Sequence, residues 1–394
     1  MTASLPLDGI TVVALEHAIA APFATRQLAD LGARVIKIER PGVGDFARAY
    51  DQRVAGLASH FVWTNRSKES LSLDLKQPAA LEILQRLLGQ ADVLVQNLAP
   101  GAAARLGLGY EALAAQYPRL IVCDISGYGE GGPYSEKKAY DLLIQSESGF
   151  LSVTGTPDQE AKAGISIADI AAGMFAYSSI LAALLQRQQT GQGRRIEISM
   201  LEAMVEWMNF PLYYAYQGQV APGRAGASHA TIYPYGAFQA GDGGRVMLGL
   251  QNEREWGVFC EKVLLQPELK SDPRFDSNAL RSQNRSELNA VIDTVFSRCD
   301  SAEIIRRLEE AAIANARVNT MAEVWRHPQL QARKRWTAID SPVGALPALW
   351  PPGASVEHPV RMGAVPALDE HSEAILSELG FAERIDDLRA RGVI

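Results

Sequence analysis

Along the first half of the chain, short apolar runs alternate with segments in which apolar residues recur at helical spacing. Compact runs rich in Val, Ile and Leu predict buried strands over residues 10–15, 33–38, 92–96, 120–125 and 194–199. The alternating Leu71, Leu73 and Leu75 predict one more short strand. Helices are expected over about 22–31 and 78–88. This strand–helix–strand order is typical of a parallel, doubly wound α/β sheet, whose ligands bind just past the carboxyl ends of the strands.

The longest apolar segment follows Asp169. From Ile170 to Leu185, apolar residues recur at helical spacing, and the next charged residue is Arg187. A buried helix with Asp169 in its first turn is predicted, where the helix dipole favours an ionised carboxylate. Asp169 is then either an N-cap, the commoner role at such a boundary, or a carboxylate nucleophile. Small residues at 168 and 171–173 are what a nucleophile would need, because a bulky reactant requires that clearance and a cap does not. On spacing alone the N-cap is still the favoured interpretation.

The second half of the chain has the pattern of a smaller α+β domain. A Gly- and Ala-rich linker over 221–230 precedes a hairpin of residues 235–239 and 245–250 and helices over about 253–263, 285–296 and 301–312. We therefore expect a large domain over 1–220, a small domain over 221–328, and a return to the large domain over 329–394. A helix over 200–217, rich in Met, Trp and Tyr, is expected to serve as core or subunit contact.

Composition narrows the function classes. The chain has 394 residues and a formal net charge of -7, which argues against general nucleic-acid binding. Cys123, Cys260 and Cys299 lack any CxxC pairing, so neither a disulfide framework nor a metal site is expected. The N-terminus lacks the pattern of a signal peptide. The apolar helix after Asp169, interrupted by Ser178 and Ser179, is too short to predict a membrane span. A soluble, cytoplasmic protein without a membrane partner is expected.

A glycine-rich loop follows the strand at 120–125. Residues 127–132 spell GxGxxG, the pattern of dinucleotide-binding turns. That pattern requires a helix to open at the loop, whereas Pro133 and a polar run follow. We interpret it as a loop near a ligand. Its backbone N–H groups, or one near Gly226, are hypothesised to hold an oxyanion.

Three segments together resemble the family III CoA-transferases. They are residues 140–149 (YDLLIQSESG), 152–155 (SVTG) and 167–173 (IADIAAG), and the similarity extends from residues 7–10 to 388–394. The resemblance implies that Asp169 is the nucleophile, and that coenzyme A or acyl-CoA is a substrate, with no permanently bound cofactor. It also implies a large Rossmann-like domain built from both chain ends, a smaller middle domain, and a homodimer of interlocked rings.

The resemblance further implies which residues contact CoA. Alone, His17 and Arg40 are typical of structural and surface residues, but both follow predicted strands. Gln96 and Ala99 occupy places where the family has an acid and an Arg or His, so this sequence departs from the pattern there. The implied contacts are His17, Ala18, Ile19, Ala20, Arg40, Leu73, Asp74, Leu75, Lys76, Asn97, Leu98, Ala99, Arg105, Lys138, Ala139, Tyr140 and Asp141.

Tyr140 separates two activities of this family. Its racemases carry a histidine there, and a phenol with a pKa of about 10 is poorly suited to proton abstraction near neutrality. CoA transfer is therefore favoured over the alternatives, an α-methylacyl-CoA racemase or a non-catalytic CoA-binding protein. The motifs resemble the branch that passes CoA from succinyl-CoA to itaconate, mesaconate or citramalate. A second acceptor carboxylate needs a cation, and the candidates are Arg66, Arg224 and His229.

Overall fold

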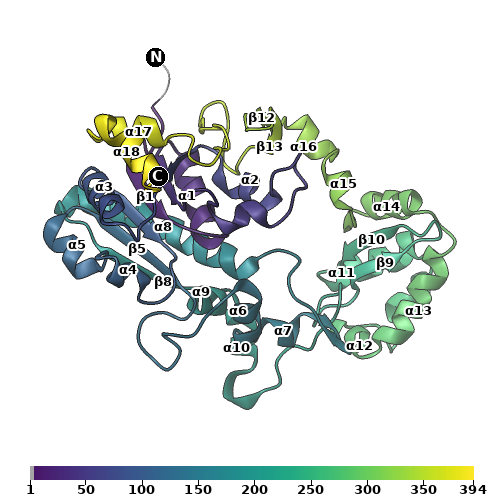
Figure 1. Ribbon diagram of the computed structural model, residues 1–394. Helices are drawn as coiled ribbons and strands as arrows, with labels where there is room; N and C mark the ends of the chain where they lie inside the picture. The colour runs from purple at the N-terminus through teal and green to yellow at the C-terminus, as the bar shows by residue number, and fades with distance from the viewer. Residues whose placement is uncertain (1–3) are drawn as a thin grey trace. The chain divides into compact units, whose positions relative to one another are not determined.

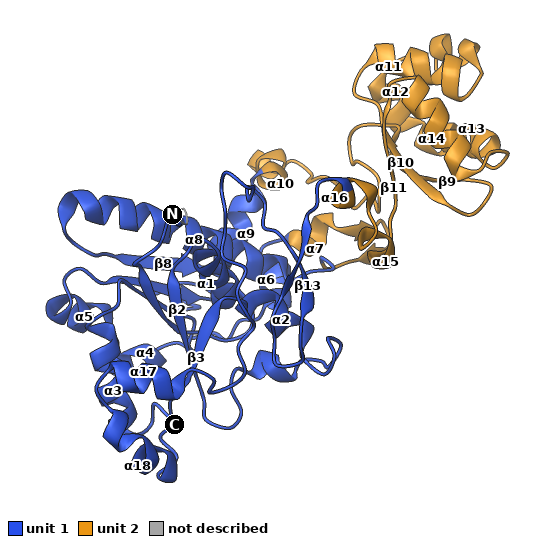
Figure 2. Ribbon diagram, turned by 90° about the horizontal axis from the view of Figure 1, so that it is seen from above, with its two compact units in different colours: residues 1–149, 163–209, 332–394 blue, residues 150–162, 210–331 orange. Residues whose placement is uncertain are grey.

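The computed structural model describes residues 4–394, which form two compact units. Unit 1 contains the residues up to 149 together with 163–209 and 332–394, and unit 2 contains 150–162 and 210–331 (Figure 2). Residues 150–162 and 210–220, which we expected in the large domain, thus belong to unit 2. Unit 1 is built from both ends of the chain.

A six-stranded parallel sheet forms the centre of unit 1. Its strands are β1 (Thr11–Leu15), β2 (Arg34–Glu39), β3 (Lys68–Ser72), β4 (Val93–Gln96), β5 (Ile121–Ser126) and β8 (Arg195–Ser199). Their order is β3-β2-β1-β4-β5-β8, and every neighbouring pair is parallel. Counted along the chain this is 3-2-1-4-5-6, the order of dinucleotide-binding folds, with its switch point between β1 and β4. The expected doubly wound sheet is present.

Helices connect and cover these strands (Figure 1). The connecting helices are α1 (Ala20–Asp30), α2 (Ser59–Asn65), α3 (Pro78–Leu88), α4 (Ala102–Arg105), α5 (Tyr110–Gln116), α6 (Asp141–Glu147) and α8 (Ile167–Thr190), and α9 (Met200–Trp207) follows the last strand. One face of the sheet packs on α3, where Ile83, Leu84 and Leu88 are buried against Ile36 and Leu94. This single apolar cluster extends to the C-terminal helices. It packs against the strands whose ends line the pocket described below.

The C-terminal segment returns to the sheet edge formed by β3. It contains the hairpin β12 (Trp336–Ile339) and β13 (Leu346–Leu349), then α17 (Ser372–Glu378) and α18 (Ile385–Ala390). The His371 N–H donates to the Ser70 carbonyl at 3.0 Å, and the Asp74 N–H donates to the Val393 carbonyl at 2.8 Å. In Figure 1 the yellow helices α17 and α18 accordingly lie beside the purple N-terminal elements. Both chain ends therefore contribute to one sheet edge.

Helix α8 packs closely against α1, and its small residues make this possible. A Cβ added at Gly173 would lie 2.7 Å from the Ala20 carbonyl oxygen and 3.0 Å from the Phe23 ring. Ala168, Ala171 and Ala172 are buried as well. Helix packing thus accounts for the small residues that we had interpreted as clearance for a reactant. With 24 residues, α8 is also long enough to span a membrane, so the expectation that it is too short was wrong.

Unit 2 contains a three-stranded antiparallel sheet covered by helices. The sheet order is β11 (Ala314–Arg317), β10 (Arg245–Gly249), β9 (Tyr235–Gln239). The helices are α11 (Glu253–Val258), α12 (Asn278–Gln283), α13 (Arg285–Phe296) and α14 (Ser301–Glu310), with the shorter α7 (Phe150–Val153), α10 (Asn209–Tyr214), α15 (Met321–Val324) and α16 (Pro328–Ala332). Trp256, Phe259 and Phe296 lie in its core. The predicted hairpin is confirmed; β11 was not predicted.

Two elements differ from their predictions. The strand expected around Leu71–Leu75 is β3, Lys68–Ser72, and the residues from Leu73 to Lys76 line the pocket described below instead. The helix expected over 200–217 divides into α9 and α10 at Met208, three residues before Pro211. Pro211 lacks the N–H that a continuous helix would need at that place.

Candidate active site

A cavity of about 620 Å³ lies at the carboxyl ends of four strands of unit 1. Leu15 ends β1, Glu39 ends β2 and is followed by Arg40, Leu73–Lys76 follow β3, and Leu98 follows β4. The cavity therefore includes the switch point between β1 and β4, where doubly wound sheets bind their ligands.

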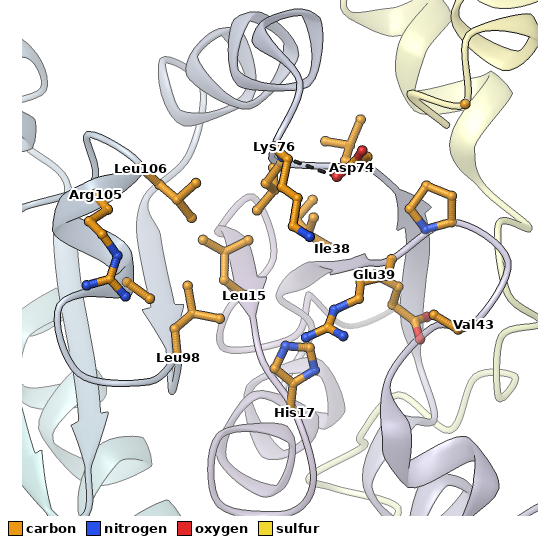
Figure 3. A pocket seen from close by; sticks show the side chains of 16 residues that line it. Leu15, His17, Ile38, Glu39, Val43, Asp74, Lys76, Leu98, Arg105 and Leu106 are labelled. Atoms are coloured by element: carbon orange, nitrogen blue, oxygen red, sulfur yellow. Dashed lines mark hydrogen bonds between the residues drawn. The ribbon is translucent and has the colours of Figure 1, made fainter. Parts of the chain in front are cut away.

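The lining combines an apolar floor with a cationic rim. Figure 3 shows Leu15, Leu98 and Leu106 between Arg105 on one side and Lys76 and His17 on the other. Arg40, Lys76 and Arg105 are exposed at the rim. Guanidinium and ammonium groups of this kind pair with phosphate oxygens, and the apolar floor suits a base or an aliphatic chain.

Of the predicted CoA contacts, His17, Arg40, Leu73, Asp74, Leu75, Lys76, Leu98 and Arg105 line this cavity. Ile19 and Ala20 are buried at the start of α1 instead. Sequence reasoning missed Val43, Ala102, Leu106 and Gly392, which also line it. Gly392 carried no local signal, because it reaches the cavity only through the return of the C-terminal segment to β3.

The turn after β1 is held by two side chains from elsewhere in the chain. The Asn97 amide accepts from the His17 N–H and donates to the His17 carbonyl, both at 2.9 Å. Ala18 has φ +60°, a conformation that non-glycine residues rarely adopt, and its N–H donates to Asp45 at 3.1 Å. Asn97 thus fixes the backbone of His17, a different role from direct ligand contact.

Beneath this turn lies a fully buried ion network. Lys37 donates to Asp45 at 2.8 Å and lies 3.3 Å from Glu16, and Lys68 donates to Glu16 at 2.6 Å. All four side chains are inaccessible to solvent. Burial lowers the pKa of Lys68 to about 7, although the charge of Glu16 opposes the shift. The network balances two cations against two carboxylates, which is how charges are retained in a core.

Glu39 fixes the segment after β2. It accepts from Arg48 at 2.7 and 2.8 Å and from Ser70 at 2.8 Å. Burial acts to raise the pKa of Glu39, but the hydrogen bonds from Arg48 and the charge of Lys37 outweigh it and lower that pKa to about 2. Glu39 is therefore an ionised anchor for Arg48 on the cavity wall.

Asp169 is the third residue of α8, which begins after Ser166. It is therefore not the N-cap. Its carboxylate accepts no hydrogen bond from any part of the chain that the structure describes, residues 4–394. Burial, together with the charge of Asp141, raises the pKa of Asp169 to about 7. A carboxylate without hydrogen-bond partners keeps its lone pairs available and is more basic than usual.

A series of ring contacts begins at His17 in the cavity and reaches Tyr50. The His17 ring stacks on Phe46 at a centroid distance of 5.4 Å, and Phe46 lies 5.8 Å from Tyr50. Burial and the charges of Asp45 and Asp169 raise the pKa of Tyr50 to about 12. Tyr50 is thus a neighbour of Asp169 that sequence reasoning missed, since nothing in its local pattern distinguishes it.

The remaining predicted contacts lie on or before α6. Tyr140 is 68% exposed, and Lys138 is exposed beside the smaller Ala139. Asp141 uses both carboxylate oxygens within the protein, on the backbone of α8 and on Gln145. None of these four residues lines the cavity, and neither does Ala99.

Two candidates for binding a second substrate carboxylate are already paired. Arg66 is 6% exposed and donates two hydrogen bonds to Asp30, at 2.7 and 2.9 Å. Within unit 2, Arg224 donates to the carbonyls of Thr156 and Pro157. Both guanidinium groups therefore stabilise the protein itself.

Three of the backbone N–H groups hypothesised to hold an oxyanion donate within the protein. The Gly129 N–H donates to Ser126 at 3.0 Å, and the Glu130 N–H donates to Glu197. The Gly226 N–H donates to the Gly155 carbonyl at 2.7 Å. These three donors are not available to a reacting oxygen.

A doubly wound sheet with a cation-rimmed cavity at its switch point defines a protein that binds an anionic, nucleotide-like ligand. The sequence model of CoA-transferase family III matches residues 7–372. The chain is 35% identical over 398 residues to succinyl-CoA:glutarate CoA-transferase of Mus musculus, covering 99% of this chain and 90% of that one. It is 34% identical over 380 residues to acetyl-CoA:oxalate CoA-transferase of Acetobacter aceti, covering 96% and 97%.

A solved structure agrees with these sequence comparisons. The crystal structure of a CAIB/BAIF family protein from Brucella suis superposes with a TM-score of 0.86 at 33% identity, covering 96% of this chain and 100% of that chain. The chain belongs to CoA-transferase family III and is an enzyme of that family. The family resemblance found in the sequence motifs is confirmed, and CoA thioesters are the substrates of this class.

Proposed function

We propose that the protein transfers CoA from succinyl-CoA to a small C4–C5 dicarboxylate, with Asp169 as the covalent nucleophile. The observation that carries the proposal is the carboxylate in the first turn of α8, which accepts no hydrogen bond among residues 4–394 and has a pKa raised to about 7. The names of the relatives, glutarate and oxalate transferases, support a dicarboxylate acceptor.

The proposed reaction begins with attack on the donor. An Asp169 oxygen attacks the thioester carbonyl, the C–S bond breaks, and CoA leaves as a thiolate. The thiolate then attacks the Asp169 carbonyl of the mixed anhydride, and the donor acid leaves as a carboxylate. Asp169 now carries CoA as a thioester. Two easier displacements thus replace one direct exchange.

The acceptor acid reverses these steps. Its carboxylate attacks the Asp169 thioester and releases the thiolate, giving a second anhydride. The thiolate attacks the acceptor carbonyl and frees Asp169. Because one thioester replaces another, no external energy source is needed. The thiolate must stay close between steps, and the cavity with Arg40, Lys76 and Arg105 at its rim suits the phosphates of CoA.

Itaconate and glutarate are the acceptors to compare first. Purified protein would be mixed with succinyl-CoA and one acid at a time, and new CoA esters followed by mass spectrometry. We expect one dicarboxylyl-CoA to form rapidly and the Asp169→Asn variant to form none. Transfer by that variant at the wild-type rate would refute the proposed nucleophile.

Racemisation is less well supported than transfer. Tyr140 occupies the position of the histidine in the family's racemases, and its phenol is 68% exposed. A proton base needs a pKa near the working pH. Loss of stereochemistry at an α-methyl acyl-CoA, without exchange with any acid, would favour the racemase instead.

We also propose a cytoplasmic homodimer, of interlocked rings as in the family. Several apolar side chains are exposed on α9 and α10, including Trp207 (45%), Phe210 (61%) and Tyr213 (74%). Exposed aromatic groups are typical of protein interfaces. A second copy of the chain is the occupant that we propose for them.

A further inference from the structure

Helix α8 begins without a side-chain cap of its own. Ser166 is at the N-cap position, yet its hydroxyl makes no capping hydrogen bond. The first N–H groups of a helix need acceptors, and a buried helix end without them is costly. Asp141 from α6 supplies one. Its Oδ1 accepts from the Ala168 N–H at 2.8 Å and from the Asp169 N–H at 3.3 Å.

A second side chain of α6 completes the arrangement. Gln145 is fully buried, and its Nε2 donates to Asp141 Oδ2 at 2.7 Å. Its Oε1 accepts from the Ala163 N–H at 2.9 Å. Residues 141 and 145 lie on the same face of α6, one turn apart. One turn of α6 therefore holds the chain at Ala163 and again at Asp169.

We propose that Asp141 and Gln145 act as a clamp that positions Asp169 for attack, and we call these two residues the α6 clamp. The inference rests on the proposed function of Asp169. Asp141 accepts hydrogen bonds from the N–H groups of residues 168 and 169. These two donors therefore do not need the Asp169 carboxylate as an acceptor. The clamp thus fixes the Asp169 backbone and leaves its carboxylate free for the substrate.

The charge of Asp141 also acts on the nucleophile. Burial is the larger cause of the raised pKa of Asp169, and the Asp141 carboxylate raises it further. Tyr50 is a phenol nearby, and its pKa, raised to about 12, leaves it uncharged near neutrality. Arg26 and Asp30 of α1 act on Tyr177 instead, further along α8, and α9 carries Glu202 in its own first turn. The charge of Asp141 is therefore the one whose removal should change the pKa of Asp169.

Donor and acceptor in the hydrogen bond between residues 141 and 145 can be exchanged by substitution without removing the bond. Asp141→Asn alone places an amide donor against the Gln145 amide donor. Gln145→Glu alone places two carboxylates together. In the double variant, the new amide at position 141 donates to the new carboxylate at position 145, which still accepts from the Ala163 N–H. The local control is Ser146→Ala, exposed on the same helix. The control for the chemical change from Asp to Asn is Asp276→Asn, exposed in unit 2.

We expect each single variant to lower kcat of CoA transfer at least about tenfold, as small displacements of a reacting group do. The KM for the CoA donor should stay within about threefold, and the double variant should recover most of the lost kcat. Both controls should match the wild type. Singles with wild-type kcat, or a double variant no better than the worse single, would overturn the proposal.

A pH profile separates positioning from simple loss of structure. Asp141→Asn removes a negative charge, so the midpoint of its kcat/KM profile should move down by about one unit. If that variant does not fold, Gln145→Glu should move the midpoint up, and an unmoved midpoint counts against the clamp. Asp169→Asn is assayed in the same series: if it still transfers CoA, the proposed function fails, whatever the clamp variants do.

Discussion

At the scale of single residues, Asp169 is distinguished by a pKa that lies well above the usual value of an aspartate. Its carboxylate must be ionised to attack, and its pKa is raised to about 7. We expect kcat/KM for CoA transfer to rise with pH between about 6 and 8 and then level off. Dicarboxylate substrates are already ionised in that range. A flat profile from pH 6 to 8 would show that Asp169 ionises at lower pH or does not limit the reaction.

The same shift affects stability. Between about pH 4 and 7 the folded protein keeps a proton on Asp169 that the unfolded chain has lost, so its contribution to stability falls as the pH rises. Asp169→Asn removes this cost. The variant should melt at least about 2 °C above the wild type at pH 8, and level with it near pH 4. An equal difference at both pH values would rule out ionisation as its cause.

Lys37 is predicted to be essential for stability. It contacts Glu16 and Asp45 in a core from which solvent is excluded. Lys37→Met would leave these carboxylates with one cation fewer, at a cost of about 3–5 kcal/mol in the free energy of unfolding. Lys262→Met, on the surface of unit 2, is the matched control and should change little. Urea titration measures both.

Local sequence showed which residues carry charge but not which of them are paired. Arg40, Lys76 and Arg105, which the family resemblance implied as CoA contacts, line the cavity, and their binding of CoA stays a prediction. Arg66 was one of three candidates for a substrate carboxylate, whereas Asp30, 36 positions earlier in the chain, accepts both of its hydrogen bonds. Such a pairing depends on the fold of the chain and leaves no periodic signal.

At the scale of elements, the contact between α1 and α8 is predicted to be intolerant of added volume. A Cβ at Gly173 would meet the Ala20 carbonyl at 2.7 Å, while one at Gly164 would meet no atom within 4 Å. Gly173→Ala should therefore cost about 1–3 kcal/mol despite the better helix propensity of alanine. Gly164→Ala is the control and should be neutral in thermal unfolding. Equal melting temperatures for the two variants would contradict this packing.

Most elements of unit 1 were predictable from periodicity. The helix α3 has the expected bounds, and the start of α8 near Asp169 was expected from the apolar repeat. The clamp on that start was not, because the resemblance implied Asp141 as a CoA contact and nothing in the local pattern distinguished Gln145. The third strand of the unit 2 sheet, β11, is short and mostly exposed, so it lacks the apolar signature of a strand.

At the scale of the whole molecule, the division into units was only partly foreseen. Residues 150–162 belong to unit 2, far in sequence from its main part at 210–331. The link is made by long-range contacts such as that of Arg224 with Thr156. A linear pattern of polar and apolar residues contains no such information.

The proposed homodimer can be tested by mass. Light scattering should give twice the 42.7 kDa of one chain. Interlocked rings cannot separate without unfolding, so the mass should persist on dilution to nanomolar concentration. A mass that falls to 42.7 kDa on dilution would argue against interlocking, and Phe210→Ser would then test whether the exposed aromatic groups form an ordinary interface.

The return of the C-terminal segment to β3 has a consequence for biosynthesis. The cavity wall contains both Leu15 and Gly392, and Gly392 is translated only after both units have been made. A nascent chain that has not reached residue 392 therefore lacks a complete cavity. Nascent chains should be unable to engage their ligand until translation has passed residue 392, which protects partly made protein from reacting with the cellular acyl-thioester pool.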